Sequence, residues 1–217
     1  MSASLEQSRH QLLHTAAELA DHHAGGERLE SYLRRYYRHV ATEDLLPRAP
    51  EDLLGAALSH QRLAQNRPVG TVNVEVFNPE VEEQGWASGH TVVQIVTDDM
   101  PFLVDSVTAE LLRMGRTVHI VVHPLVLVRR NAAGDLEEVL DRGAADSGTD
   151  GGATPEFGVV RESWMHLEID RDSDPQDRKA IADNLRRVLS DVREAVEDWP
   201  KMRAKCTEIA QVLEQSP

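Results

Sequence analysis

Residues 91–130 read TVVQIVTDDMPFLVDSVTAELLRMGRTVHIVVHPLVLVRR, and this stretch decides the fold. Residues 90–97 are rich in β-branched side chains, which predicts a buried strand. Over 101–114 the apolar residues recur every three to four positions, which predicts a helix that ends at Gly115. Residues 117–130 are dense in valine, isoleucine and leucine and predict a longer strand. A strand, a helix and a strand in this order indicate a fold that mixes sheet and helix.

The residues after this stretch predict further strands of the same sheet. Pro124 cannot donate to a sheet ladder, so we expect an edge position or a bulge there. Residues 136–140 predict a short returning strand, and the weakly apolar residues 143–155 predict a loop. Clean alternation over 162–170 predicts another strand with one apolar face and one face toward solvent. The solvent face carries Trp164, His166 and Glu168, and either a second protein layer or a ligand could cover it.

A long amphipathic helix is predicted near the C-terminus. It begins at Asp174-Pro175 and runs to Val196, and Pro200 is expected to kink or end it. A last helical stretch follows, and its apolar face has no obvious partner within the chain. We expect this face to be an interaction face, formed by Met202, Cys206, Ile209 and Leu213.

Upstream of residue 69 the sequence predicts a helical block. One helix is capped by Ser4 and ended by Gly25-Gly26, and a second carries an apolar stripe from Leu29 to Val40. A third begins at Pro50, which the first turn of a helix tolerates. From Gly70 the apolar period changes to two, so 71–76 predict a strand.

These elements predict an α+β sandwich in which both later helices pack on one face of a mostly antiparallel sheet. We divide the chain into a helical block at 1–68, an α+β domain at 69–198 and a C-terminal helical linker at 199–217.

The composition excludes several classes of partner. The formal net charge is −14, which repels nucleic acids and anionic membranes, so we expect neither as a partner. No apolar run is long enough to span a membrane, and the N-terminus lacks the apolar core of a signal peptide. The single cysteine, Cys206, cannot form an internal disulfide, which fits the cytoplasm.

The motifs of common active sites are missing. The sequence has no G-x-G-x-x-G after a strand, no phosphate-binding G-x-x-x-x-G-K-[ST], no C-x-x-C pair and no G-x-S-x-G elbow. We therefore expect no catalytic residue, no bound cofactor and no metal in this chain.

The histidines give two weak alternatives to that expectation. His10, His14 and Glu18 share one helix face and could hold a metal, but a solvated face is the simpler interpretation. His119 and His123 share a strand face at ~13 Å, too far apart to bind one ion, because a strand rises ~3.3 Å per residue. We interpret them as edge or packing residues.

The turn at 97–104 is the most informative local feature. It joins a strand end to a helix N-terminus, where backbone N–H groups could receive a small anion such as an amino-acid carboxylate. The alternative is ordinary capping of the helix by Asp98 or Asp99, with Pro101 in its first turn. The candidate effector turn comprises Asp98, Asp99, Met100, Pro101, Phe102 and Leu103.

Residues 91–130 resemble the first ACT-like module of the large bacterial NAD-specific glutamate dehydrogenases. The likeness extends to the leading helices, VNVEVFNP, ESWMHLEID and VREAVEDWPKM. It implies an ACT-like, ferredoxin-like sandwich in a parent enzyme that converts L-glutamate and NAD to 2-oxoglutarate, ammonia and NADH. The catalytic and NAD-binding residues of that family lie outside this sequence, so NAD is implied for the parent alone.

The turn departs from the pattern of ligand-binding ACT domains, which resembles D-R-P-G-L. This chain has Asp99-Met100-Pro101-Phe102-Leu103, so Phe102 replaces the glycine that lets a ligand approach. We expect the Phe102 side chain to fill that space.

The leading hypothesis is thus a non-catalytic regulatory and assembly region in contact with the other domains and subunits of its parent. A stand-alone module that senses an amino acid is the alternative. A small self-contained enzyme is the third hypothesis, and the missing motifs argue against it.

Overall fold

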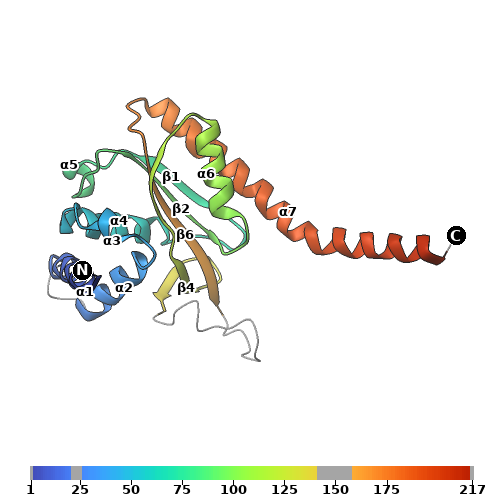
Figure 1. Cartoon of the computed structure of the whole chain (residues 1–217), viewed down its shortest axis with the longest axis horizontal. Helices are drawn as coiled ribbons and strands as arrows, with labels where there is room; N and C mark the ends of the chain where they lie inside the picture. Colours follow the sequence, from blue (N-terminus) through green and yellow to red (C-terminus); the bar gives the residue numbers. More distant parts are fainter. Residues whose placement is uncertain (1, 21–25, 141–157, 216–217) are drawn as a thin grey trace.

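The structure is a computed structural model that describes residues 2–20, 26–140 and 158–215 (Figure 1). The helices are α1 (Ser2–Glu18), α2 (Gly26–Tyr36), α3 (Thr42–Leu45), α4 (Pro50–Leu63), α5 (Val81–Gln84), α6 (Leu103–Arg113) and α7 (Pro175–Gln215). The strands are β1 (Asn73–Phe77), β2 (Thr91–Asp98), β3 (Val118–Val122), β4 (Leu125–Arg130), β5 (Leu136–Val139) and β6 (Val159–Ile169). None of the described helices is both long enough and apolar enough to cross a membrane.

The strands form one antiparallel sheet in the order β1-β2-β6-β4-β5, with β6 near its middle. One edge of β6 pairs with β2, and the other pairs first with β4 and then with β3. The long strand predicted over 117–130 is therefore interrupted at Pro124. The Pro124 carbonyl still accepts a hydrogen bond from the Trp164 N–H (3.1 Å), so the break removes only the donor that proline lacks.

Helices α6 and α7 pack together on one face of the sheet, as predicted (Figure 1). Leu103, Val107 and Leu111 of α6 are buried there against the apolar side chains of β2 and β6. Leu185 and Leu189 of α7 complete this core. The α+β class and its antiparallel sheet are thus confirmed.

The opposite face of the sheet is covered by the helical block α1–α4 (Figure 1). Trp164, His166 and Glu168 were expected to point toward solvent, but each is at most 2% exposed. The reason is that the leading helices form a second layer and share a core with the sheet, in which Leu33 and Leu53 pack with Trp164. Of the two alternatives for this face, the covering protein layer is confirmed.

Some element boundaries differ from the prediction. Helix α1 begins at Ser2, so Ser4 lies inside it and does not cap it. Helix α2 ends at Tyr36, before Val40. The short helices α3 and α5 were not predicted. The predicted loop at 143–155 lies outside the described residues.

The C-terminal helix is longer than predicted. Helix α7 is continuous over 41 residues and contains Pro200, which was expected to kink or end the helix that begins at Pro175. A proline inside a helix removes a single backbone hydrogen bond, and the residues on both sides of it are good helix formers. In Figure 1 the axis of α7 changes direction where the helix leaves the body of the molecule, and its last part extends away alone.

Candidate functional site

A buried cluster of charges lies beside the turn that the sequence singled out. Glu162 of β6 is fully buried and accepts hydrogen bonds from Arg67 Nε (2.9 Å) and from Arg130 Nε (2.6 Å). The indole N–H of Trp164 donates to the other carboxylate oxygen at 2.9 Å. Arg67 follows α4 and Arg130 ends β4, so this carboxylate fastens the helical block to the sheet.

Asp98 extends this cluster to the C-terminal helix. Its Oδ1 accepts from Arg67 (2.6 Å), and its Oδ2 lies 2.8 Å from the guanidinium of Arg193 in α7. Burial opposes the ionisation of Asp98, but the two arginines outweigh it and hold the pKa of the carboxyl below its usual value. One chain of ion pairs thus joins the root of α7 to the interior.

The turn itself is built differently from the prediction. Neither aspartate caps α6: Phe102 is the N-cap residue, and no side chain donates or accepts a capping bond. Asp98 is the last residue of β2, and Pro101 precedes the helix and is not in its first turn. Asp98 is held by arginines, which explains why it is not available as a cap.

Phe102 adopts the left-handed backbone conformation, with φ 69°, that glycine adopts most easily. Its ring was expected to fill a ligand space, but 68% of the residue is exposed. The backbone thus keeps the shape a glycine would give it, while the ring points outward. Leu103, next in the chain, is buried in the core below α6.

A cleft of about 370 Å³ opens between the helical block and the sheet. Arg48 and Asp52 line one wall, the loop at 86–90 lines another, and His166 and Glu168 lie among its lining residues. Arg48 holds Glu168 through two hydrogen bonds, at 2.6 and 3.0 Å. Burial raises the pKa of the Glu168 carboxyl, but the contacts with His166 and Arg48 outweigh it and lower the pKa to about 2.

The polar groups below this cleft are mutually satisfied. The Gln94 amide donates to Ala56 O (3.0 Å) and accepts from Ser59, which fixes its orientation. The same amide nitrogen lies 3.1 Å from His166 Nδ1, and His166 Nε2 lies 3.6 Å from Glu168 Oε1. These contacts tie the helical block to the sheet.

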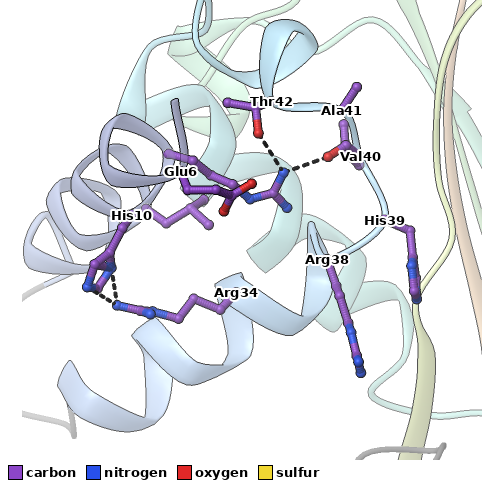
Figure 2. Close-up of a pocket in the computed structure, with 10 residues that line it drawn as sticks. Glu6, His10, Arg34, Arg38, His39, Val40, Ala41 and Thr42 are labelled. Carbon is purple, nitrogen blue, oxygen red and sulfur yellow. Dashed lines mark hydrogen bonds between the residues drawn. The ribbon is translucent and has the colours of Figure 1, made fainter. Parts of the chain in front are cut away.

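A second, more open groove of about 550 Å³ lies among α1, α2 and the segment after α2 (Figure 2). Its cations do not converge. The Arg9 guanidinium is occupied by the Val40 carbonyl (2.6 Å), and Arg34 reaches His10. In Figure 2 Arg38 and His39 point away from Val40 and Thr42, the residues that hold the Arg9 guanidinium. The groove therefore has no common point at which these groups could hold a ligand.

The histidines singled out in the sequence are held by ordinary ion pairs and hydrogen bonds. His14 lies 2.9 Å from Glu30 and 3.5 Å from Glu18, and no group of metal-binding side chains occurs within the described residues. His119 lies 2.8 Å from Asp170, and His123 lies 2.6 Å from Ser163 Oγ. The last two are the edge and packing residues expected for this strand.

The last part of α7, here called the arm (residues 194–215), carries the predicted interaction face. Met202 is 49% exposed and Ile209 is 50% exposed, and Cys206 is also exposed. Trp199, which was not predicted, is 61% exposed on the same part of the helix. Leu213 belongs to the helix as well. The sequence missed Trp199 because it precedes Pro200, where the helix was expected to stop.

The comparisons with known proteins agree on one family. A family model described as the ACT1 domain of glutamate dehydrogenase matches residues 32–185. An NAD-specific glutamate dehydrogenase of Pseudomonas aeruginosa is 35% identical over 96% of this chain, and that of Halomonas elongata is 39% identical over 86%. The enzyme of Mycobacterium tuberculosis is 27% identical over 77%.

The chain covers only 12%, 11% and 10% of the length of these three relatives, so it corresponds to a small part of each. The matched residues 32–185 include the whole sheet, the buried charge cluster around Glu162 and the turn before α6. Because the match to this family extends over residues 32–185, more than half of the sequence, the chain belongs to the family of glutamate dehydrogenase ACT1 domains.

Proposed function

We propose that this chain is the non-catalytic regulatory and assembly region of a large NAD-specific glutamate dehydrogenase located in the cytoplasm. The parent would oxidise L-glutamate to 2-oxoglutarate and ammonia while NAD is reduced. In this proposal the chain contacts the other domains of the parent and its other subunits. The observation that carries the proposal is the arm, which leaves the folded body and exposes Trp199, Met202 and Ile209.

The residues present do not fit NAD. A dinucleotide needs a glycine-rich turn between a strand and a helix, so that its pyrophosphate can approach backbone N–H groups. The turn from β2 to α6 has Met100 and Phe102 at the positions of close approach and two aspartates before them. NAD therefore belongs to the parent in this proposal and not to this chain.

Two experiments test the proposal. The isolated chain should show no NAD binding by calorimetry and no glutamate-dependent NADH production. In the full-length parent, Met202→Glu with Ile209→Glu should alter oligomer size in light scattering, whereas the matched surface variant Glu208→Gln should not. Micromolar binding of NAD by the isolated chain would contradict the proposal. It would also be contradicted if the double variant changed neither the assembly nor the regulation of the parent.

A stand-alone amino-acid sensor is the second candidate function. The observation that favours it is the uncapped start of α6, which leaves the first backbone N–H groups without a side-chain partner. An effector carboxylate would bind near Met100 to Leu103, and Asp99 would face its ammonium group. Titration of the labelled chain with amino acids by NMR tests this candidate: saturable shifts at 98–103 support it, and shifts confined to the cleft beside Glu168 or no shifts contradict it.

A further inference from the structure

The arm continues the apolar stripe that holds α7 on the sheet. Leu185 and Leu189 are buried under the sheet, and Val192 packs partly against the same core. Beyond the body the stripe runs on with alternating steps of three and four residues. It comprises Trp199, Met202, Cys206, Ile209 and Leu213.

This spacing is the a and d pattern of a coiled coil. With Trp199, Cys206 and Leu213 at position a, Met202 and Ile209 fall at position d. Pro200 then lies at position b, on the outer side of the helix, where it does not interrupt the seam. The first four side chains of the stripe are exposed, with 61% of Trp199 and 50% of Ile209 accessible. A helix with such an apolar seam is stabilised when another surface covers it.

We propose that the arm pairs with the arm of a second copy of this chain as a parallel, in-register two-stranded coiled coil. The inference rests on the proposed function, in which the arm is an assembly surface, and it names the partner of that surface.

The charges beside the seam favour this partner and this orientation. Asp198 is at position g and Arg203 is at position e of the next heptad, so in a parallel pair Asp198 of each copy faces Arg203 of the other. In a fully overlapping antiparallel pair, Arg203 would face the second Arg203 and Lys205 would face the second Lys205. Like charges at these positions are unfavourable, so the fully overlapping antiparallel pair is disfavoured relative to the parallel pair.

Cys206 supplies a direct readout of the orientation. It is the single cysteine of the chain and occupies position a, where the two copies of a parallel, in-register pair meet across the seam. Added diamide would accept the two electrons and two protons of the paired thiols and become the hydrazine, while one S–S bond forms. An antiparallel pair would place Cys206 opposite a d position, away from the second Cys206.

The experiment uses the whole 217-residue chain. Sedimentation should show a concentration-dependent dimer, and diamide should convert that dimer to a covalent one. Ile209→Glu should abolish both while circular dichroism of the body is retained. As a matched control, Ala204→Cys with Cys206→Ser moves the thiol to the outer position f, where diamide should no longer link the dimer.

Charge reversal tests the partner pairs. Asp198→Arg alone should weaken the dimer about tenfold, since two attractions become two repulsions, and adding Arg203→Asp should restore it. A monomeric wild-type chain, equal crosslinking from position 204, or no rescue by the double reversal would overturn the inference. A monomeric chain together with a parent assembly that still responds to Met202→Glu and Ile209→Glu would overturn only this inference and leave the proposed function standing.

Discussion

Replacing Glu162 with glutamine should destabilise the fold more than any single surface change. The variant keeps the size of the side chain but removes the negative charge that faces Arg67 and Arg130, both of which are at most 4% exposed. It also puts an amide nitrogen where one of the carboxylate oxygens accepted hydrogen bonds. Removing one partner of a buried ion pair costs about 3–5 kcal/mol, because the remaining charge is left without compensation.

Asp98 limits this loss but cannot cancel it. It pairs with Arg67 through Oδ1, but it is shared with Arg193 and does not reach Arg130, whose remaining bond goes to the Gly134 carbonyl at 2.8 Å. Arg130 therefore loses its hydrogen bonds to a carboxylate and keeps only the electrostatic attraction of Asp135. Since domains are stable by about 5–15 kcal/mol, the variant should lose a large part of its free energy of unfolding.

Urea unfolding followed by tryptophan fluorescence measures this change, because Trp164 lies inside the cluster. The matched control is Glu75→Gln on the exposed side of β1, which should change the free energy of unfolding by less than about 0.5 kcal/mol. If Glu162→Gln were within about 1 kcal/mol of the wild type, the cluster would not fasten the two layers and the reasoning would be wrong.

Three further predictions use other sites. Phe102→Gly should raise the free energy of unfolding by up to about 1 kcal/mol in urea titrations, because it relieves a left-handed backbone and sacrifices little burial. Burial lowers the pKa of His60 to about 3, so below pH ~6.5 the unfolded chain binds a proton that the folded chain does not. The free energy of unfolding should therefore fall by about 1.4 kcal/mol per pH unit between pH ~6.5 and about pH 4.5. His60→Gln should show a smaller slope over that window, whatever its absolute stability. Gly55→Ala should cost about 1–3 kcal/mol in thermal melts, since its Cβ would clash with Trp86, whereas Gly89→Ala meets nothing and should be neutral.

Local patterns were enough to predict the sheet and the two helices on its first face. The alternation over 162–170 assigned Met165 and Trp164 to opposite faces correctly, because strand periodicity depends only on neighbouring residues. What covers the second face depends on where the helical block packs. That information lies in contacts between residues such as His60 and Trp164 that are far apart in the chain, so the sequence left it open.

The charge cluster could not be predicted for the same reason. Arg67 and Glu162 are separated by 95 residues, and nothing in the spacing of either connects them. The only signal was a glutamate on the face of a strand that the alternation assigned to solvent. Of the two expectations for Pro200, the end of the helix is wrong, because the stability of α7 comes from its packed root and from the long stretches on both sides of the proline.

Because α7 is one continuous helix, its exposed arm moves together with the part of the helix that packs on the sheet. Its root packs on the sheet beside α6, while the arm of 194–215 extends about 33 Å at ~1.5 Å per residue. Arg193, at the fulcrum, is tied through Asp98 to Arg67 and so to the layer of helices on the far side of the sheet. A tilt of about 5° at that fulcrum displaces the tip by ~3 Å, so a small rearrangement between the two layers becomes a large movement at the point where the arm meets its partner.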